Sequence, residues 1–304
     1  MRTMSGHLIY TEVKSVELKK YQAPTSIGEQ IENLRSLGLI INNDEEAGDF
    51  LNDVSYFRLI KAYSIGLKKK NGKYNPDVTF DIIKELYLFN CNFRQALFAQ
   101  IEKVEINFRC RIANYFSDKY GNFGYEDGNN FENQDYHMNF MNEISCEISR
   151  NSKNAFVKNF RDNYETGKIP LYALIELFSF GILSKFYKNM KKEDKKQIAQ
   201  IYGLKYTYLE SWLEHLAYVR NICAHYGRVY NVNFSKTPAM YKQYIKQGIT
   251  NVRVYATLIC LSNLLPKDRH WIDFIDLTET LFDKYPNVKK QLMGFPENWK
   301  LLLK

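Results

Sequence analysis

The strongest constraint on the fold is a long stretch, from Thr79 to about Lys119, that contains neither proline nor glycine. Apolar residues recur in it at intervals of three or four, which is typical of one face of an α-helix. The residues of this stripe are Leu97, Ile101, Val104, Phe108, Ile112 and Tyr115. The pattern predicts one long helix, preceded by a polar boundary loop at 68–77.

The rest of the chain also favours an all-α fold. Its 15 glycines and 7 prolines are too few for the many tight turns of a β-sandwich or barrel. Ser26 and Glu29 have the spacing of a capping box, and Asn43 can cap a second helix. We expect helices at about 26–38, 45–54, 135–150, 153–164, 170–189, 191–202, 207–227, 251–264 and 268–284. They divide into an N-terminal helical segment (1–78), a helical bundle (79–235) and a C-terminal helical cap (236–304).

The composition indicates a soluble globular protein. Hydrophobic residues make up 45% and charged residues 25%, which excludes a disordered chain, and a mean hydropathy of -0.43 excludes a polytopic membrane protein. The apolar run at 171–187 falls short of a membrane span, and the first 17 residues show no signal peptide. The five cysteines are isolated, which suits reduced thiols. We therefore expect a cytoplasmic protein without a membrane partner.

The charge balance and the absent motifs narrow the function. The 42 basic residues against 34 acidic ones give a net charge of +8, the sign expected of a protein that meets phosphate or an acidic surface. The motifs of P-loop nucleotide hydrolysis, Rossmann redox chemistry, zincin proteolysis and the α/β-hydrolases are absent. The histidines and cysteines have no metal-ligand spacing. We therefore expect no metal and no cofactor.

The segment at 212–231 carries the residue types best suited to catalysis. At about 100° per residue, one helix face gathers Leu209, Trp212, Leu213, Leu216, Val219 and Cys223. Arg220 falls inside this apolar arc and needs a partner there, for which Glu102 or Glu105 is available. A polar stripe on another face contains Glu214, Tyr218, Asn221, His225 and Arg228.

The spacing of Arg220 and His225 leaves their joint role open. On an ideal helix they point about 140° apart, so one substrate meets both only if Arg220 curls round or the helix distorts. Asn221 and His225, four residues apart, meet easily. A structural interpretation also stands, in which Arg220 is half of a buried ion pair and His225 only complements the helix dipole.

Four sequence blocks resemble a known family. The block RNICAHYGRVYN (220–231) resembles the R-N-x-x-A-H-x-x-R-x-x-N block of the Abi-like (abortive infection) proteins, a bacterial branch of the HEPN superfamily. Three further blocks are similar to those of the same family: LNDVSYFRLIKAY (51–63), FRQALFAQIEKVEINFRCRI (93–112) and PLYALIELFSFGILSKFY (170–187). Tyr172 stands where tryptophan is usual. The resemblance covers about residues 31–231, and the order of the blocks is more specific than the Arg and His pair alone.

The resemblance implies an all-α, HEPN-like helical bundle, often dimeric, and in many relatives a metal-independent endoribonuclease that acts as a toxin in phage-infected cells. Such an enzyme leaves a 2′,3′-cyclic phosphate and a 5′-hydroxyl. His225 would serve as base or acid, and Arg220 would stabilise the charge of the phosphorane. Asn221 would orient His225 or a phosphate oxygen, and Arg228 would bind a flanking phosphate.

Three acidic residues and one arginine outside this block are expected in structural roles. Glu102, Glu105 and Arg109 lie within about 60° on the long helix and can hold Arg220 or each other, with a catalytic supporting role carrying less weight. Glu176 is expected as a buried partner or a helix cap.

Tyr218 is expected to have a supporting, structural role like these residues. Three lysines are further candidates for RNA binding. Lys188, Lys191 and Lys192 can form an RNA-backbone track, although a solvated face is the default for such a run. The expected partners are RNA, a second copy of the chain, and an antitoxin protein or structured RNA. The alternative function is a non-catalytic RNA-binding or scaffold protein, because some HEPN proteins lack nuclease activity.

Overall fold

The chain is all-α over residues 23–303, the part that the computed structural model describes; it contains isolated β-bridges there but no strand. The all-α prediction is confirmed. The first 17 residues, for which we predicted no signal peptide, lie outside the described residues. The helices are α1 (Ile27–Ser36), α2 (Asp44–Val54), α3 (Phe80–Tyr120), α4 (Gln134–Arg150), α5 (Ala155–Asn163), α6 (Leu171–Leu174), α7 (Phe180–Asn189), α8 (Lys192–Ile201), α9 (Tyr206–Ala224), α10 (Lys242–Lys246), α11 (Val254–Leu264) and α12 (Arg269–Lys284).

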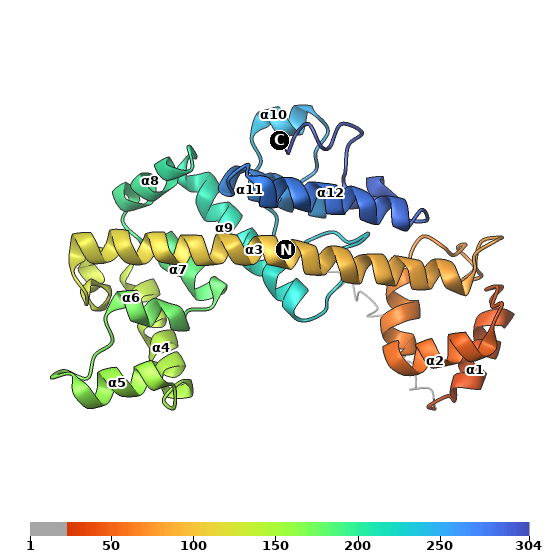
Figure 1. The fold of residues 1–304 in the computed structure, drawn as a ribbon, viewed down its shortest axis with the longest axis horizontal. Helices are drawn as coiled ribbons and strands as arrows, with labels where there is room; N and C mark the ends of the chain where they lie inside the picture. The colour runs from red at the N-terminus through yellow and green to blue at the C-terminus, as the bar shows by residue number, and fades with distance from the viewer. Residues whose placement is uncertain (1–22, 304) are drawn as a thin grey trace, which may run out of the picture.

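The long helix α3 is the axis of the molecule (Figure 1). The Thr79 hydroxyl accepts a hydrogen bond from the Ile82 amide at its start, and Gly121, at φ 78°, ends it. The predicted apolar stripe is buried, and only Tyr115 in it is half-exposed. The prediction of one long helix is therefore confirmed, because local capping and side-chain periodicity act in the same direction.

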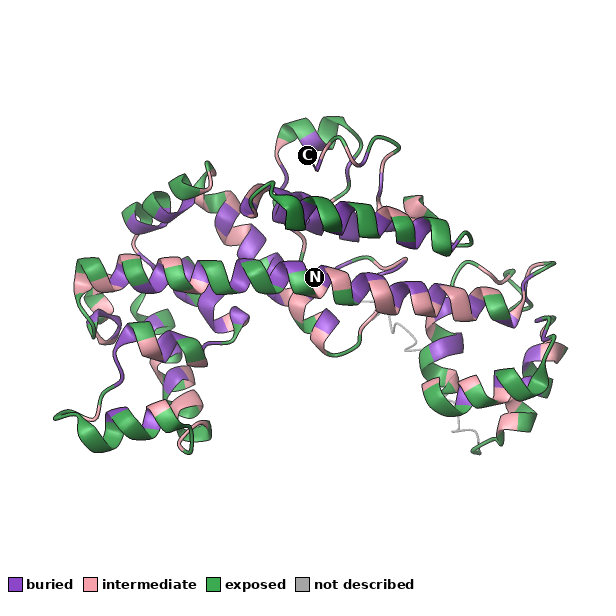
Figure 2. Cartoon of the chain, viewed as in Figure 1, coloured by how far each residue is buried: buried purple, intermediate pink, exposed green. Residues whose placement is uncertain are grey.

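Most of the other helices form three groups around α3, while α9 crosses α3 between them (Figure 1). The helices α1 and α2 lie at its N-terminal end, α4 to α8 gather toward its C-terminal end, and α11 and α12 run along one side. Figure 2 shows α12 exposed on its outer side and buried toward the rest of the molecule. The boundaries at residues 78 and 235 stay predictions. Among the described residues, no helix is long and apolar enough to cross a membrane.

The predicted helix at 170–189 is wrong as one continuous element. It is divided into α6, the 3₁₀ turn η4 (Ile175–Leu177) and α7, with Phe178 in an extended conformation between them. The Ser179 hydroxyl accepts from the Ile182 amide and starts α7, while Arg109 donates to the Phe178 carbonyl. The break therefore exposes a carbonyl that α3 uses.

A buried histidine joins α9 to the C-terminal part of the chain. His215 is 1% exposed; its Nδ1 lies 2.7 Å from the Lys236 carbonyl, and its Nε2 lies 2.9 Å from the Thr257 hydroxyl of α11. A neutral ring satisfies both contacts, with Nδ1–H donating to the carbonyl and Nε2 accepting from the hydroxyl. Burial lowers the pKa of His215 to about 4, while the contact with Lys236 acts in the opposite direction.

This histidine should make stability depend on pH. An unfolded histidine titrates near about 6.5, so between pH 6.5 and 4 the unfolded chain binds a proton that the folded chain excludes. The free energy of unfolding should therefore fall as the pH drops through this window, by on the order of 3 kcal/mol from His215 alone. Urea unfolding at several pH values checks this. His215→Gln should flatten the curve, whereas His270→Asn, a change at an exposed histidine, should not; equal curves for wild type and His215→Gln would contradict it.

Candidate functional site

The candidate site lies at the C-terminal end of α9, which packs against α3 and α7. The helix ends at Ala224, three residues earlier than predicted, and His225 is its C-cap. The Tyr226 amide donates to the Cys223 carbonyl, and the Gly227 amide donates to the Ile222 carbonyl at 2.7 Å. This is a Schellman motif, which turns the chain sharply away after His225.

Arg220 faces α3 from a position just before the last turn of α9. Its Nε lies 3.4 Å from Glu105 Oε2, and its guanidinium lies 5.6 Å from the centre of the Phe98 ring. The Nε contact is an ion pair without hydrogen-bond geometry. One third of the Arg220 side chain remains exposed, and its two terminal nitrogens form no hydrogen bond with any group in residues 23–303. Arg220 is therefore anchored on one side and free to bind an anion on the other.

Glu105 is the buried centre of the surrounding ion-pair network. Its Oε1 accepts from Arg109 Nη2 at 3.0 Å, and the same nitrogen donates to the Phe178 carbonyl at 2.9 Å. Glu102 is exposed and forms no ion pair within the described part of the chain. Of the two acids considered from the sequence, Glu105 is thus the partner of Arg220.

Glu176 was expected to be a buried partner or a helix cap, and it is neither buried nor a cap, since Ser179 caps α7. It lies in the 3₁₀ turn η4 with 61% of its side chain exposed, and its Oε2 is 3.7 Å from Arg109 Nη1. The expected pairing exists, but the break between α6 and α7 leaves this carboxylate at the surface.

Asn221 and His225 are exposed, and their side chains form no hydrogen bond within residues 23–303. Their backbones are linked, since the His225 amide donates to the Asn221 carbonyl at 3.0 Å. The helix stays regular through Ala224, so distortion does not remove the separation of about 140° between Arg220 and His225. The imidazole and the guanidinium of one chain therefore leave the helix on different sides.

Arg228 and Tyr218 make contacts within the chain. Arg228 Nη1 donates to the Ala62 carbonyl, and its guanidinium lies 6.0 Å from the centre of the Tyr63 ring. Burial lowers the pKa of Arg228, with Tyr63 acting in the opposite direction. The Tyr218 hydroxyl accepts from the Ser235 hydroxyl at 3.1 Å. Arg228 thus ties the end of α9 to the N-terminal segment.

The three candidate lysines lie at the junction of α7 and α8. Lys188 Nζ is 3.8 Å from Glu214 Oε2 across to α9, and Lys192 donates its amide to Glu132. Lys191 precedes α8 and is half-buried. Because Lys188 is already near a carboxylate, a track along this edge has less free charge than the sequence suggests.

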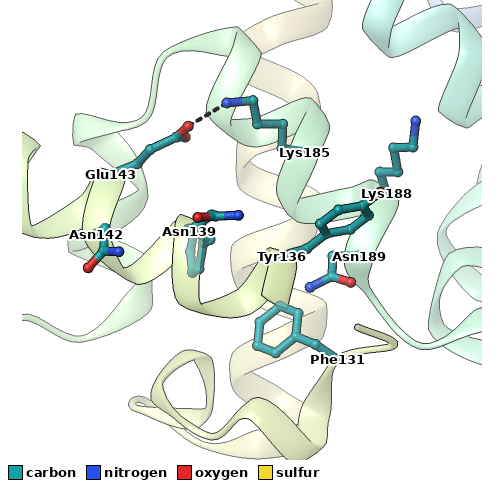
Figure 3. Close-up of a pocket in the computed structure, with 9 residues that line it drawn as sticks. Phe131, Tyr136, Asn139, Asn142, Glu143, Lys185, Lys188 and Asn189 are labelled. Carbon is teal, nitrogen blue, oxygen red and sulfur yellow. Dashed lines mark hydrogen bonds and ion pairs between the residues drawn. The ribbon is translucent and has the colours of Figure 1, made fainter. Parts of the chain in front are cut away.

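A pocket of about 550 Å³ lies between α4 and α7, and Lys188 lines it (Figure 3). Figure 3 shows Lys185 reaching across to Glu143 on α4. The Asn189 side chain accepts from the Asn133 amide and donates to the Asn133 carbonyl. These polar groups already have partners within the chain, so the pocket is a weaker candidate than the end of α9.

Sequence reasoning did not single out Arg58 and Arg94, although both lie in blocks that carry the family resemblance. Arg58 Nη1 donates to the Tyr226 carbonyl at 3.2 Å, and the Arg94 guanidinium lies 5.4 Å from the centre of the Tyr226 ring. Both therefore border the residue that follows His225. The position of these arginines within the blocks was the available signal.

The described residues contain no group of three or more His, Cys, Asp or Glu that could hold a metal ion. A family model with the description Abi-like protein matches residues 49–231, more than half of the chain. No curated protein and no solved structure matches the chain significantly. The matched span contains Arg220, Asn221 and His225 together with Glu105.

Proposed function

The chain belongs to the Abi-like family, and on that premise we propose that it is a metal-independent endoribonuclease of the HEPN type that acts as a toxin in abortive infection. Family membership suggests the abortive-infection role. The nuclease activity is our further step, based on the residues at the end of α9.

One observation carries this proposal: the C-terminal end of α9 presents acid–base and anion-binding groups that have no complete set of partners within the described chain. Arg220 is held by Glu105 yet keeps its terminal nitrogens free, and Asn221 and His225 are exposed. A purely structural Arg220 would need only the pairing with Glu105. The free imidazole of His225, at the same end of α9, is what an acid–base reaction requires.

The proposed reaction uses the nucleophile that RNA itself carries. A base removes the proton of a 2′-hydroxyl, and the 2′-oxygen then bonds to the adjacent phosphorus. Arg220 stabilises the phosphorane charge, and Asn221 orients an imidazole or a phosphate oxygen. The bond from phosphorus to the 5′-oxygen breaks, and an acid protonates that oxygen. The products are a 2′,3′-cyclic phosphate and a 5′-hydroxyl, with His225 as base or acid.

Induction of the wild type and of His225→Ala in cells, followed by sequencing of RNA ends, tests this function. Growth arrest with new 5′-hydroxyl ends in the wild type alone is the expected result. Equal arrest by both proteins without new ends would reject the nuclease in favour of a non-catalytic RNA-binding or scaffold protein.

We propose further that the active species is a homodimer whose two Arg220 and His225 stripes face each other. One imidazole cannot be a deprotonated base and a protonated acid at the same instant, whereas two imidazoles can divide these roles. A two-fold axis brings identical residues together. The separation of about 140° on one helix then no longer matters, because the imidazole of one chain can meet the guanidinium of the other.

Mixed dimers test the shared site. After subunit exchange at equal amounts, wild type and His225→Ala should retain about one quarter of the wild-type activity if both imidazoles are needed, against about one half for independent sites. Light scattering should give the dimer mass at the concentrations assayed. A cleaving monomer, or retention of one half, would contradict the shared site.

A further inference from the structure

Three arginines from distant parts of the sequence meet beside the end of α9. Arg58 belongs to the π-helical turn η1 (Phe57–Lys61), Arg94 to α3, and Arg228 to the loop after α9. Arg58 contacts the backbone of Tyr226 and Arg94 contacts its ring, while Arg228 reaches the end of η1 at Ala62. Figure 1 shows the chain after α9 turning back between α3 and the N-terminal elements.

Two tyrosines next to this cluster have pKa values that the same guanidinium groups influence. Burial and Cys91 raise the pKa of Tyr63, while Arg228 and Arg94 act in the opposite direction. Burial likewise raises the pKa of Tyr87, against which Arg58 and Arg94 act. The two rings pack edge to face at 5.6 Å. The three positive charges therefore share one neighbourhood.

No carboxylate within residues 23–303 forms an ion pair with any of the three. This is most unusual for Arg94, which is only 7% exposed and whose guanidinium receives no hydrogen-bond acceptor from the described residues. An arginine with so little exposed surface usually pairs with a carboxylate. The neighbouring Arg109 and Arg220 follow that rule, since both pair with Glu105. The nitrogens of Arg94 are not among the side-chain atoms that are sealed from solvent without a partner, so its guanidinium keeps some contact with water. Arg58 is exposed, and Arg58 and Arg228 each donate to a backbone carbonyl, but in the described part of the chain none of the three arginines has a carboxylate partner, so the cluster keeps its positive charge available for an anion.

The backbone around the cluster is held in uncommon conformations. Tyr226 has φ 59° at the position of the Schellman motif that glycine usually occupies, and Ser55, just before η1, has φ 60°. A π-turn such as η1 is frequently found at functional sites. These conformations leave two aromatic rings at the surface, Tyr226 at 67% and Phe57 at 79% exposure.

We infer that Arg58, Arg94 and Arg228 form a phosphate-binding subsite for single-stranded RNA, next to the cleavage residues, with Tyr226 and Phe57 as surfaces on which bases stack. The inference rests on the proposed function and extends it. Single strands are typically bound by cationic grooves combined with exposed aromatic rings, which suits this set. Because Tyr226 follows His225 directly, a phosphate bound here belongs to a nucleotide close to the one that is cleaved.

The test measures binding of a short fluorescein-labelled single-stranded RNA to the full-length His225→Ala protein over a range of salt concentrations. Adding Arg58→Ala should weaken binding about five- to tenfold and reduce the slope of log K against log salt by about 0.7, the value for one lost phosphate contact. The matched control is Arg269→Ala, which removes the same charge from α12, where Arg269 pairs with Asp273. It should leave affinity and slope unchanged. A duplex RNA of the same sequence should bind more weakly, because its bases cannot stack on the rings.

The outcomes separate this inference from the nuclease itself. Selective weakening by Arg58→Ala supports the subsite even if the wild type produces no RNA ends. Equal effects of Arg58→Ala and Arg269→Ala reject the subsite even if the wild type cleaves RNA. Binding of inorganic phosphate that Arg58→Ala weakens, together with an RNA affinity that Arg58→Ala leaves unchanged, would assign the arginines to a free anion and reject the strand. Arg94→Gln should repeat the loss of affinity, with thermal melting to establish that it folds.

Discussion

Purified protein with His225 replaced by alanine is expected to cleave RNA about a thousandfold more slowly than the wild type, the range typical of a lost acid–base group. Its thermal unfolding should not change, because the side chain is exposed and makes no hydrogen bond within residues 23–303. Cleavage by the wild type should also survive EDTA, because 2′-hydroxyl chemistry needs no metal. Rates measured on one labelled RNA with and without the chelator check both points. Loss of activity in EDTA that added divalent metal restores would contradict the mechanism.

Arg220→Ala should separate chemistry from stability. Cleavage should again fall by about a hundred- to a thousandfold, because the guanidinium that we propose to stabilise the phosphorane is lost. Unlike the histidine change, this one should also lower the free energy of unfolding by about 1 kcal/mol, since it removes an ion pair to a buried carboxylate. The loss stays modest because Glu105 keeps Arg109 as a partner. Equal stability of the two variants would show that the pairing is energetically unimportant.

The parts of this structure that could be predicted from the sequence are those that local interactions decide. The capping box of Ser26 and Glu29 and the cap at Asn43 form as expected, and Thr79, where the predicted long helix was to begin, is the cap of α3. Each of these caps depends on a side chain and an amide within three residues of it. The long helix α3 follows from the same kind of local pattern, repeated without interruption.

What the sequence could not decide depends on tertiary contacts. The break at Phe178 supplies a carbonyl to Arg109, which lies far away along the chain, and periodicity alone continued the helix across it. The choice between Glu102 and Glu105 was open because both lie near one face of α3, and only the packing of α9 decides it. His215 received no role from the sequence, although it joins α9 to α11 through Thr257.

The candidate site shows the same division. Family resemblance selects Arg220, Asn221 and His225, and the fold leaves all three partly or fully exposed at the end of α9. The absence of an acid beside Arg94 among residues 23–303 cannot be seen in a linear pattern. It depends on which helix face α3 turns toward Tyr226, and this is decided by the whole bundle.

Glu105 should matter most for stability, because its carboxylate serves two arginines in a site that is nearly closed to solvent. Glu105→Ala leaves Arg109, whose side chain is only 15% exposed, without its close partner. Removing one member of a buried pair typically costs about 3 kcal/mol or more, because the remaining charge is uncompensated. Glu102→Ala is the matched control. Glu102 lies one turn earlier on α3, is exposed and forms no ion pair among the described residues. Its replacement should change the free energy of unfolding by less than about 0.5 kcal/mol. Urea unfolding of the two variants measures the difference. Glu105→Ala should also slow cleavage, because Arg220 loses its anchor, and a variant with wild-type stability would show that the network does not hold the end of α9 in place.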